Sequence, residues 1–285
     1  MTPLIFTLLV FAASIVAGFG GSILGLGGGI IIIPVLTLGF GIDIHLAIGA
    51  SIISVIATSS GAAAAYVREH MTNLRVAMFL ELGTTSGALS GAYLAGILAG
   101  RWLFVVFAVV LGLSAFAMFQ RRHYDPHAPI PPDRVADRLR LHGEYVSLSG
   151  GGVGERVSYR VAHSMFGLGL MYVAGVVSGL LGIGSGSLKV PAMDLAMHLP
   201  IKVSSATSNF MIGVTAAASA GVYFMRGQID PFIAAPVAAG VLVGALAGSR
   251  LLPKLRGRTV RIAFVIVLAW VCVQMLYKGV WGAGG

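Results

Sequence analysis

The sequence predicts an all-α integral membrane protein made of two inverted repeats, each with about five membrane segments. The first reason is composition, because 57% of the residues are hydrophobic and only 10% are charged, far from the averages of soluble domains. The second is a series of apolar runs close to the ~20 residues that a membrane-spanning helix needs. The third is a duplication, in which a constant offset of 157 positions aligns the two halves of the chain.

Ten apolar runs mark the predicted membrane segments. They fall at about residues 3–19, 22–40, 45–67, 75–98, 101–119, 163–181, 183–199, 203–225, 231–249 and 260–277. The first two runs of each half are short or interrupted by glycine, so we expect them to be broken or re-entrant at Gly-rich motifs. We expect no cleavage of the first run as a signal peptide, because residues 1–7 carry no Lys or Arg and a matching run recurs inside the chain.

The duplication is clearest in two Gly-rich motifs that end in proline. The first reads GLGGGIIIIP at 25–34, and the second reads GIGSGSLKVP at 182–191. The same register aligns Thr58 with Thr215, Tyr66 with Tyr223 and Gly87 with Gly244. A register kept over most of both halves indicates two fused copies of one unit. The predicted parts are therefore an N-terminal membrane repeat (1–119), a linker (120–162) and a C-terminal membrane repeat (163–285).

Basic residues set the expected orientation. The formal net charge is +9, yet Lys and Arg gather in loops, as membrane orientation requires, so we exclude nucleic acid as a partner. If the first two segments of each repeat return to the side from which they started, most basic residues lie on one face and the second copy is inverted. That face is cytoplasmic under the positive-inside rule. The linker is then predicted to be cytoplasmic and both termini external.

The linker is the one long polar stretch of the sequence. Residues 144–148 and 156–161 alternate in polarity on either side of 149–154, a pattern typical of a short β-hairpin. The polar, proline-containing composition favours a solvated connector over a flap that lies at the membrane interface.

The Gly-rich motifs are the predicted substrate site. Backbone amides at the start of a helix bind anions without a dedicated side chain, and broken segments repeated in two halves mark the binding sites of transporters. We expect one shared anion site near the middle of the membrane, formed by Gly25, Gly27, Gly28 and Gly29 with Gly182, Gly184, Ser185, Gly186 and Ser187. The alternative is that the glycines only let helices cross closely.

Lys189 is the most informative residue of the second motif. A charge at membrane depth is costly and marks a functional site by default, and the first copy has Ile32 at the matching position. Ser208 and Asn209 would add hydrogen-bond donors beside it. The alternatives are a lysine that extends to the membrane interface and hydroxyl groups that bond to carbonyls of their own helix.

Glu81 lies a few residues into the predicted fourth segment, where the second copy has Ala238. A buried carboxylate there would couple proton movement to transport, whereas an interfacial or Arg-paired glutamate would be structural. We predict no metal, because no histidine spacing resembles a metal site and the single cysteine, Cys272, cannot form a cysteine cluster or an internal disulfide. No cofactor is predicted, since the glycines do not have nucleotide-binding spacing.

The paired motifs, their duplication and the segment SSATSN at 204–209 resemble the sulfite exporter TauE/SafE family of membrane permeases. The resemblance covers the chain apart from the linker. It implies a carrier of two repeats in a bacterial cytoplasmic membrane that moves sulfite, sulfonates or related small anions, commonly outward. The first copy departs from the family pattern, because it has AIGAS at 47–51 where the family usually shows a Thr-Ser pair.

The expected function is secondary transport of small anions by alternating access around a midplane site. The expected partners are a small anionic substrate and the lipid bilayer, and a homo-oligomer is left open. An anion channel and a membrane scaffold that acts through the linker are the alternatives. We do not expect an enzyme, because the sequence lacks the motifs of intramembrane hydrolases.

Overall fold

The computed structural model describes residues 3–98, 100–120, 131–147 and 155–281. The first repeat contains α1 (Pro3–Leu24), α2 (Gly29–Pro34), the π-helical turn η1 (Val35–Gly39), α3 (Ile44–Arg68), α4 (Leu74–Ala95) and α5 (Gly100–Gln120). The linker contains α6 (Arg134–Arg138), β1 (Gly143–Ser147) and β2 (Glu155–Tyr159). The second repeat contains α7 (Ser164–Leu181), α8 (Gly186–Pro191), the π-helical turn η2 (Ala192–Ala196), α9 (Ile201–Met225), α10 (Pro231–Ser249), the 3₁₀ turn η3 (Leu252–Lys254) and α11 (Gly257–Trp281).

Seven helices of the described residues are long and apolar enough to cross a membrane. They correspond to α1, α3, α5, α7, α9, α10 and α11. The chain is therefore a multi-pass membrane protein, and the predicted all-α integral membrane class is confirmed. The eighth long helix, α4, has 22 residues and carries Arg75 and Glu81 in its first half.

The second segment of each repeat is broken, whereas the first segment, which was also expected to be broken or re-entrant, is not. The runs at 22–40 and 183–199 do not form long helices; each gives a six-residue helix, α2 or α8, that continues as a π-helical turn. Pro34 and Pro191 end these helices, because proline has no backbone N–H for the regular ladder and the bonding pattern changes after it. The first segments, in contrast, are continuous helices, so each break follows α1 or α7 and does not interrupt it.

Short polar side chains start several of the long helices. Asp43 accepts a hydrogen bond from the backbone of His45 at the start of α3, Asn73 accepts one from Val76 at α4, and Asp230 accepts one from Phe232 at α10. Such caps satisfy backbone donors that have no partner inside the helix. They explain why the apolar runs begin as helices at these points.

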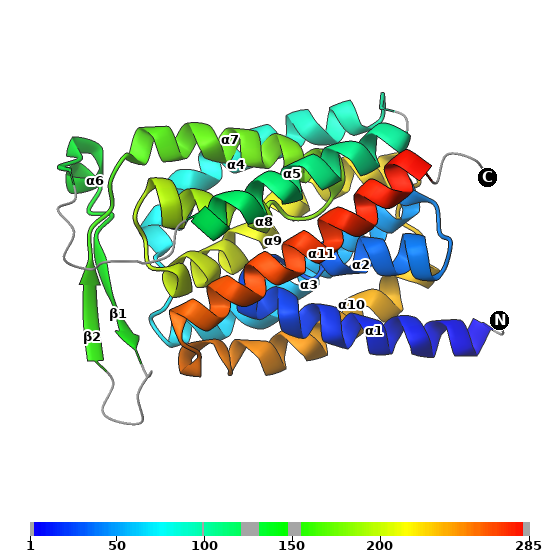
Figure 1. The fold of residues 1–285 in the computed structure, drawn as a ribbon, viewed down its shortest axis with the longest axis horizontal. Helices are drawn as coiled ribbons and strands as arrows, with labels where there is room; N and C mark the ends of the chain where they lie inside the picture. Colours follow the sequence, from blue (N-terminus) through cyan, green and yellow to red (C-terminus); the bar gives the residue numbers. More distant parts are fainter. Residues whose placement is uncertain (1–2, 99, 121–130, 148–154, 282–285) are drawn as a thin grey trace.

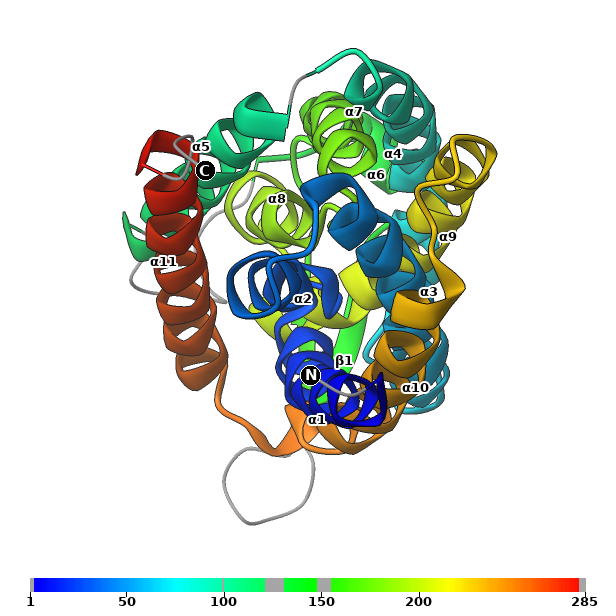
Figure 2. The ribbon, with the colours of Figure 1, turned by 90° about the vertical axis from the view of Figure 1, so that its right-hand side faces the viewer.

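The two repeats are interleaved. Figure 2 shows α2 and α8 at the centre, surrounded by the longer helices. Helix α1 packs against α10 of the other repeat, and its counterpart α7 packs against α4 (Figure 1). The counterparts α3 and α9 pack against each other, as do α5 and α11. Every one of these pairs joins one repeat to the other, so neither repeat has a separate core.

Hydrogen bonds also join the two repeats. The Ser51 hydroxyl donates to the Gly182 carbonyl (2.8 Å), and its counterpart Ser208 donates to the Gly25 carbonyl (2.7 Å). Each bond ties a long helix of one repeat to the break of the other. Reciprocal contacts of this kind are expected when two similar units are related by a two-fold axis.

Helix α11 contacts both π-helical turns. Near its start, Arg261 forms a bidentate ion pair with Asp194 of η2 (2.7 and 3.0 Å). Near its end, the Lys278 ammonium donates to the Thr37 carbonyl of η1 (2.6 Å). The helical rise places Arg261 and Lys278 about 25 Å apart. The breaks therefore meet at the centre of the molecule, while η1 and η2 lie toward opposite ends of it.

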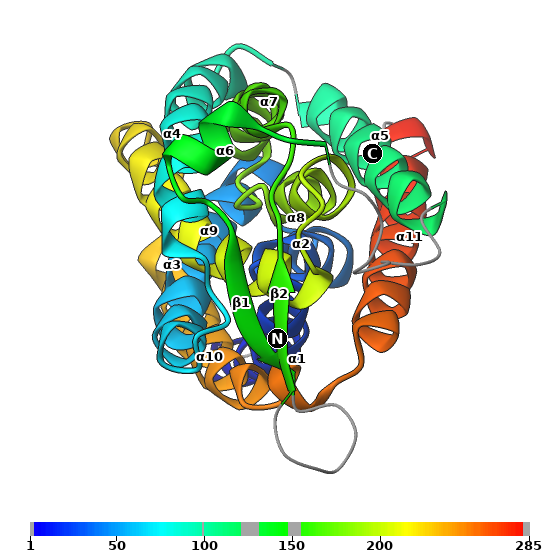
Figure 3. The same ribbon diagram turned by 90° about the vertical axis from the view of Figure 1, so that its left-hand side faces the viewer.

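The described part of the linker packs on one end of the bundle (Figure 3). The predicted hairpin is present as antiparallel β1 and β2. Leu141, Tyr159 and Val161 are buried in one apolar cluster with residues of α4 and η2. The predicted solvated connector was wrong for these residues, because composition does not show which apolar side chains find a partner surface. The turn predicted at 149–154 lies outside the described residues.

Asp133 fastens the linker to α7. Its carboxylate accepts hydrogen bonds from the backbone and the hydroxyl of Ser164 (2.6 and 2.7 Å) and caps α6 through Val135 and Ala136. Burial alone would raise the pKa of Asp133, but these four donors outweigh burial and hold the pKa below its usual value.

Candidate functional site

Lys189 is held at the centre of the molecule by the turn before α8. Gly182 and Gly184 adopt left-handed backbone angles (φ +66° and +73°), and Ser185 does so as well (φ +57°). These angles turn the chain sharply after α7, because they are disfavoured in helices and strands of L-residues. The side chain of Lys189 is 0% exposed, so it does not extend to the membrane interface.

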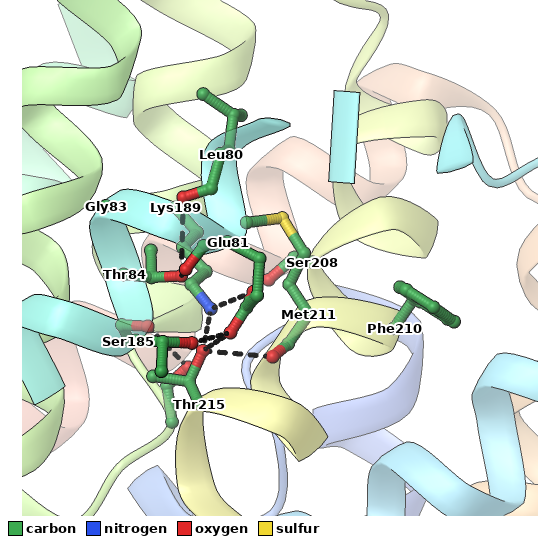
Figure 4. Close-up of polar contacts among 12 residues, drawn as sticks. Leu80, Glu81, Gly83, Thr84, Ser185, Lys189, Ser208, Phe210, Met211 and Thr215 are labelled. Atoms are coloured by element: carbon green, nitrogen blue, oxygen red, sulfur yellow. Dashed lines mark hydrogen bonds and ion pairs between the residues drawn. The ribbon is translucent and has the colours of Figure 1, made fainter. Parts of the chain in front are cut away.

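The Lys189 ammonium binds two groups from other helices (Figure 4). It donates to the Thr215 hydroxyl of α9 (2.6 Å), and it lies 3.7 Å from Oε2 of Glu81 on α4. Oε1 of the same carboxylate accepts hydrogen bonds from Thr215 (2.7 Å) and Thr85 (3.0 Å). Lys189, Thr215, Glu81 and Thr85 thus form one cluster, called the lysine cluster below, in which Lys189 and Thr215 are buried and Glu81 and Thr85 are partly exposed.

Glu81 is paired with Lys189, which neither alternative for this residue anticipated. Its side chain is 15% exposed, and it makes no ion pair with arginine among the described residues. Its Oε2 atom is buried and has no hydrogen-bond partner in the described structure. Among the described residues, the charge partner of this oxygen is the Lys189 ammonium, 3.7 Å away.

The predicted glycines lie where the two breaks cross. Gly27 and Gly184 both face Val55 and Ile212, which are counterparts in the two repeats. A Cβ on Gly29 would meet the Ser51 hydroxyl, and one on Gly186 would meet the backbone of Gly25 and Leu26. These contacts explain the glycines as close-crossing residues. Their contact with a substrate, predicted for Gly25, Gly27, Gly28, Gly29, Gly182, Gly184 and Gly186, stays a prediction.

The polar residues predicted beside Lys189 fall into two groups. Ser208 donates to the Gly25 carbonyl, the Ser185 hydroxyl to the Gly184 carbonyl (2.7 Å), and the Asn209 amide to the Ser22 carbonyl (2.6 Å). These groups hold the breaks in place. In contrast, several buried oxygens have no hydrogen-bond partner among the described residues, including Ser187 Oγ, Ser204 Oγ, Ser205 Oγ and Asn209 Oδ1.

All four of these unpartnered oxygens belong to the second repeat. Their counterparts in the first repeat are apolar, namely Ile30, Ala47, Ile48 and Ile52. An unpaired buried polar group costs free energy unless something else satisfies it. At these four positions the second repeat is therefore polar where the first is apolar.

Two members of the lysine cluster, Thr215 and Thr85, were not predicted as site residues. For Thr215 the sequence offered one signal, its alignment with Thr58 in the repeat register. In the structure the Thr58 hydroxyl accepts a hydrogen bond from the Gly28 backbone of the first break (3.2 Å). Thr85 had no such signal, since its counterpart is Leu242. No group of three or more His, Cys, Asp and Glu side chains that could hold a metal ion occurs among residues that the structure describes.

A helical membrane bundle with a buried, charge-paired lysine beside broken helices has the form of a membrane transporter. Comparison with known proteins identifies the family. The model of the sulfite exporter TauE/SafE family matches residues 10–275, and the chain belongs to this family.

Curated relatives support the same class. The probable membrane transporter protein YunE of Bacillus subtilis (strain 168) is 28% identical over 286 residues, covering 96% of this chain and 98% of that protein. The probable membrane transporter protein YdhB of the same organism is 26% identical, covering 87% and 90%. A probable membrane transporter protein of Xylella fastidiosa (strain 9a5c) is 25% identical, covering 82% and 80%. No solved structure matches the chain. These findings indicate a membrane transporter rather than an enzyme.

Proposed function

We propose that this protein is a secondary transporter that exports small anions, such as sulfite, sulfonates or related organosulfur compounds. The observation that carries the proposal is the buried ammonium of Lys189, which lies at the second helix break among hydroxyl groups of α8 and α9. A buried cation attracts an anion strongly, because little water screens it. The family description, sulfite exporter, supports this substrate class.

The transport cycle we propose is alternating access around the region where the breaks cross near the midplane. The two repeats are taken as inverted in a bacterial cytoplasmic membrane, with the linker on the cytoplasmic side. The reciprocal bonds Ser51–Gly182 and Ser208–Gly25 support a two-fold relation between the repeats. The attachment of η1 and η2 to opposite ends of α11 supports inversion. Alternate opening toward the two sides is a natural motion of inverted repeats.

A carrier is favoured over a channel by the burial of the site. The side chains of Lys189 and Thr215 are fully buried, and Val55 and Ile212 fill the crossing between the breaks. A conducting channel needs a continuous polar path, whereas a carrier passes through closed states. Saturable flux that reaches a plateau with anion concentration is expected for the carrier, and non-saturating conductance would identify a channel.

The proposal is tested by anion flux in proteoliposomes. Sulfite, sulfate, thiosulfate and a sulfonate are compared for the unaltered protein, Lys189→Ala and Lys189→Arg. Removing one partner of a buried ion pair typically costs about 3–5 kcal/mol, so the alanine variant should lose anion affinity by a factor of roughly 100 or more. The arginine variant should keep part of it. Unchanged transport by Lys189→Ala would contradict the assignment of the site.

A matched control separates loss of charge from loss of packing. Ile32 is the counterpart of Lys189 and is equally buried. Ile32→Val removes one methylene group at a typical cost of about 0.5–1.5 kcal/mol and no charge. Its anion affinity should therefore stay close to that of the unaltered protein.

A further inference from the structure

The carboxylate of Glu81 lies where a bound anion would be expected. It accepts a hydrogen bond from Thr215 and faces the Lys189 ammonium at 3.7 Å, which are the two groups that would hold a substrate oxyanion (Figure 4). Two negative groups cannot both be paired with a single buried cation without a large electrostatic cost. Ionised Glu81 and a bound anion are therefore in competition for Lys189.

Protonation of Glu81 removes the competition. It leaves one uncompensated positive charge in the lysine cluster, and it converts the unpartnered Oε2 from an acceptor into an O–H donor. Lys189 and protonated Glu81 then both offer hydrogen-bond donors to the same space. The Thr215 hydroxyl joins them when it turns away from Oε1 of Glu81, which keeps the hydrogen bond from Thr85. Such a set suits an oxyanion and leaves no buried acceptor facing another acceptor.

Among the described residues, no other charged group competes for this role from the helices that pack on α4. Tyr93 on α4 is exposed. The other titratable side chains on or against α4 are held elsewhere: Arg75 by the Arg140 carbonyl, Arg226 by the Ala92 carbonyl, Tyr172 near Ser90, Lys202 by the Pro253 carbonyl and Tyr223 by the Gly179 carbonyl. Arg75 is the nearest along α4, about 9 Å from Glu81 by the helical rise. Lys202 is about 20 Å from Thr215 along α9.

We propose that the site carries a monoanion together with one proton, and that ionised Glu81 takes the place of the anion when the site is empty. This inference rests on the proposed transport function. With a pH gradient that is acidic outside, coupled export proceeds only when the internal anion concentration exceeds the external one by more than the proton gradient offsets. One cation, one neutral carboxylic acid and one monoanion give a neutral buried complex. A dianion would leave an unpaired negative charge, which is costly in a buried site. The preferred substrates are therefore singly charged oxyanions such as sulfonates.

The test uses a sulfonate, 2-hydroxyethanesulfonate, because its acid is too strong to be protonated in water near neutral pH. Any proton that enters with it must therefore be carried by the protein. In proteoliposomes that contain a pH-sensitive dye, uptake should acidify the lumen by one proton per anion. A gradient of one pH unit, acidic outside, should sustain about tenfold accumulation, because one pH unit corresponds to 1.36 kcal/mol. An imposed membrane voltage should have no effect on this accumulation.

Glu81→Gln is the informative variant, because glutamine imitates the protonated carboxylic acid. It should still take up the sulfonate but should not respond to the pH gradient, and its uptake should become sensitive to voltage, since the anion now moves without a proton. Glu144→Gln is the control. Glu144 lies on β1 and pairs with Arg156 at the surface, so this variant should behave as the unaltered protein.

The outcomes are distinguishable. Saturable sulfonate uptake by the unaltered protein without luminal acidification would overturn the coupling and leave the transport function standing. Retention of the pH-gradient response by Glu81→Gln would also overturn it, and so would competition by sulfate as strong as that by a second sulfonate. Absence of flux for every anion would overturn the transport function and this inference with it. If Glu81→Gln does not fold, the dye measurement on the unaltered protein still decides.

Discussion

In the first repeat the Thr58 hydroxyl accepts a hydrogen bond from the backbone of Gly28, whereas in the second repeat the equivalent Thr215 accepts one from the side chain of Lys189. The surrounding residues differ in the same sense. Lys189 at the second break has Ile32 as its counterpart at the first. Glu81, which faces Lys189, has Ala238 as its counterpart. The scaffold is thus shared by the two repeats, while the charged residues belong to one of the two equivalent positions.

This difference shows that the two repeats keep equivalent scaffold contacts but carry different polar side chains at equivalent positions. Two-fold packing brings the breaks together and supports them with reciprocal bonds. The proposed substrate anion need not lie on the pseudo-two-fold axis, because its proposed charge partner, Lys189, has no charged counterpart in the first repeat. Substitutions at equivalent scaffold positions should therefore lower stability equally in the two repeats. Substitutions in the lysine cluster and at its counterparts in the other repeat should lower stability unequally.

The largest expected effect comes from giving the first break a charge. Ile32→Lys would bury an ammonium with Ala238 in place of the glutamate, and an uncompensated buried charge costs about 3–5 kcal/mol or more. We expect a strong loss of thermal stability in detergent. The double variant Ile32→Lys/Ala238→Glu should recover part of it. Ile32→Met is the control, with an expected cost below about 1.5 kcal/mol. If Ile32→Lys has no effect on stability, the first break is not the apolar environment described above.

Smaller losses of stability, equal in the two repeats, are expected when a glycine at the α4–α7 contact or at the α1–α10 contact is replaced by alanine. A Cβ on Gly87 would meet the Tyr172 carbonyl, and one on its counterpart Gly244 would meet the Ile15 carbonyl. Gly87→Ala and Gly244→Ala should each lower stability by about 1–3 kcal/mol through overpacking. Gly221→Ala on α9 is the control, because no atom lies within 4 Å of the added methyl group. A clear difference between the first two variants would show that the scaffold is not shared.

The smallest effects are expected at the reciprocal bonds of Ser51 and Ser208. Ser51→Ala and Ser208→Ala should each cost about 1 kcal/mol, the net value of one hydrogen bond. Ser60 on α3 is exposed and bonds to the Ile56 carbonyl of its own helix, so Ser60→Ala should cost less. Unfolding followed by circular dichroism at matched detergent concentration would compare the three. A cost at Ser51 several times that at Ser208 would contradict the equivalence of the two bonds.

Sequence reasoning found Lys189 and Glu81 separately but not as a pair. Each was visible because a charge in an apolar run is rare, and each was asymmetric with respect to the repeat. Their contact joins α8 to α4, and periodicity within one helix carries no information about which distant helix lies opposite. The repeat register paired Thr215 with Thr58 as equivalent positions, but it did not show that Thr215 contacts Lys189.

Packing and exposure were harder to predict than helix content. The Gly-rich motifs were correctly located as breaks, but α1 and α7 proved continuous, since glycine is tolerated in a helix that packs closely on a neighbour. The linker seemed solvated because most of its residues are polar. A few apolar side chains, among them Leu141 and Tyr159, are enough to dock it on the bundle.

The central claim is that the substrate anion binds at the lysine cluster, on one side of the two-fold arrangement. Anomalous diffraction from crystals with bound 2-bromoethanesulfonate tests it directly, because bromine marks the ligand position. The expected result is a single peak close to Lys189, with the sulfonate within hydrogen-bond reach of the Lys189 ammonium and the Thr215 hydroxyl. A peak at the crossing between Val55 and Ile212, or equal peaks beside Ile32 and Lys189, would contradict it.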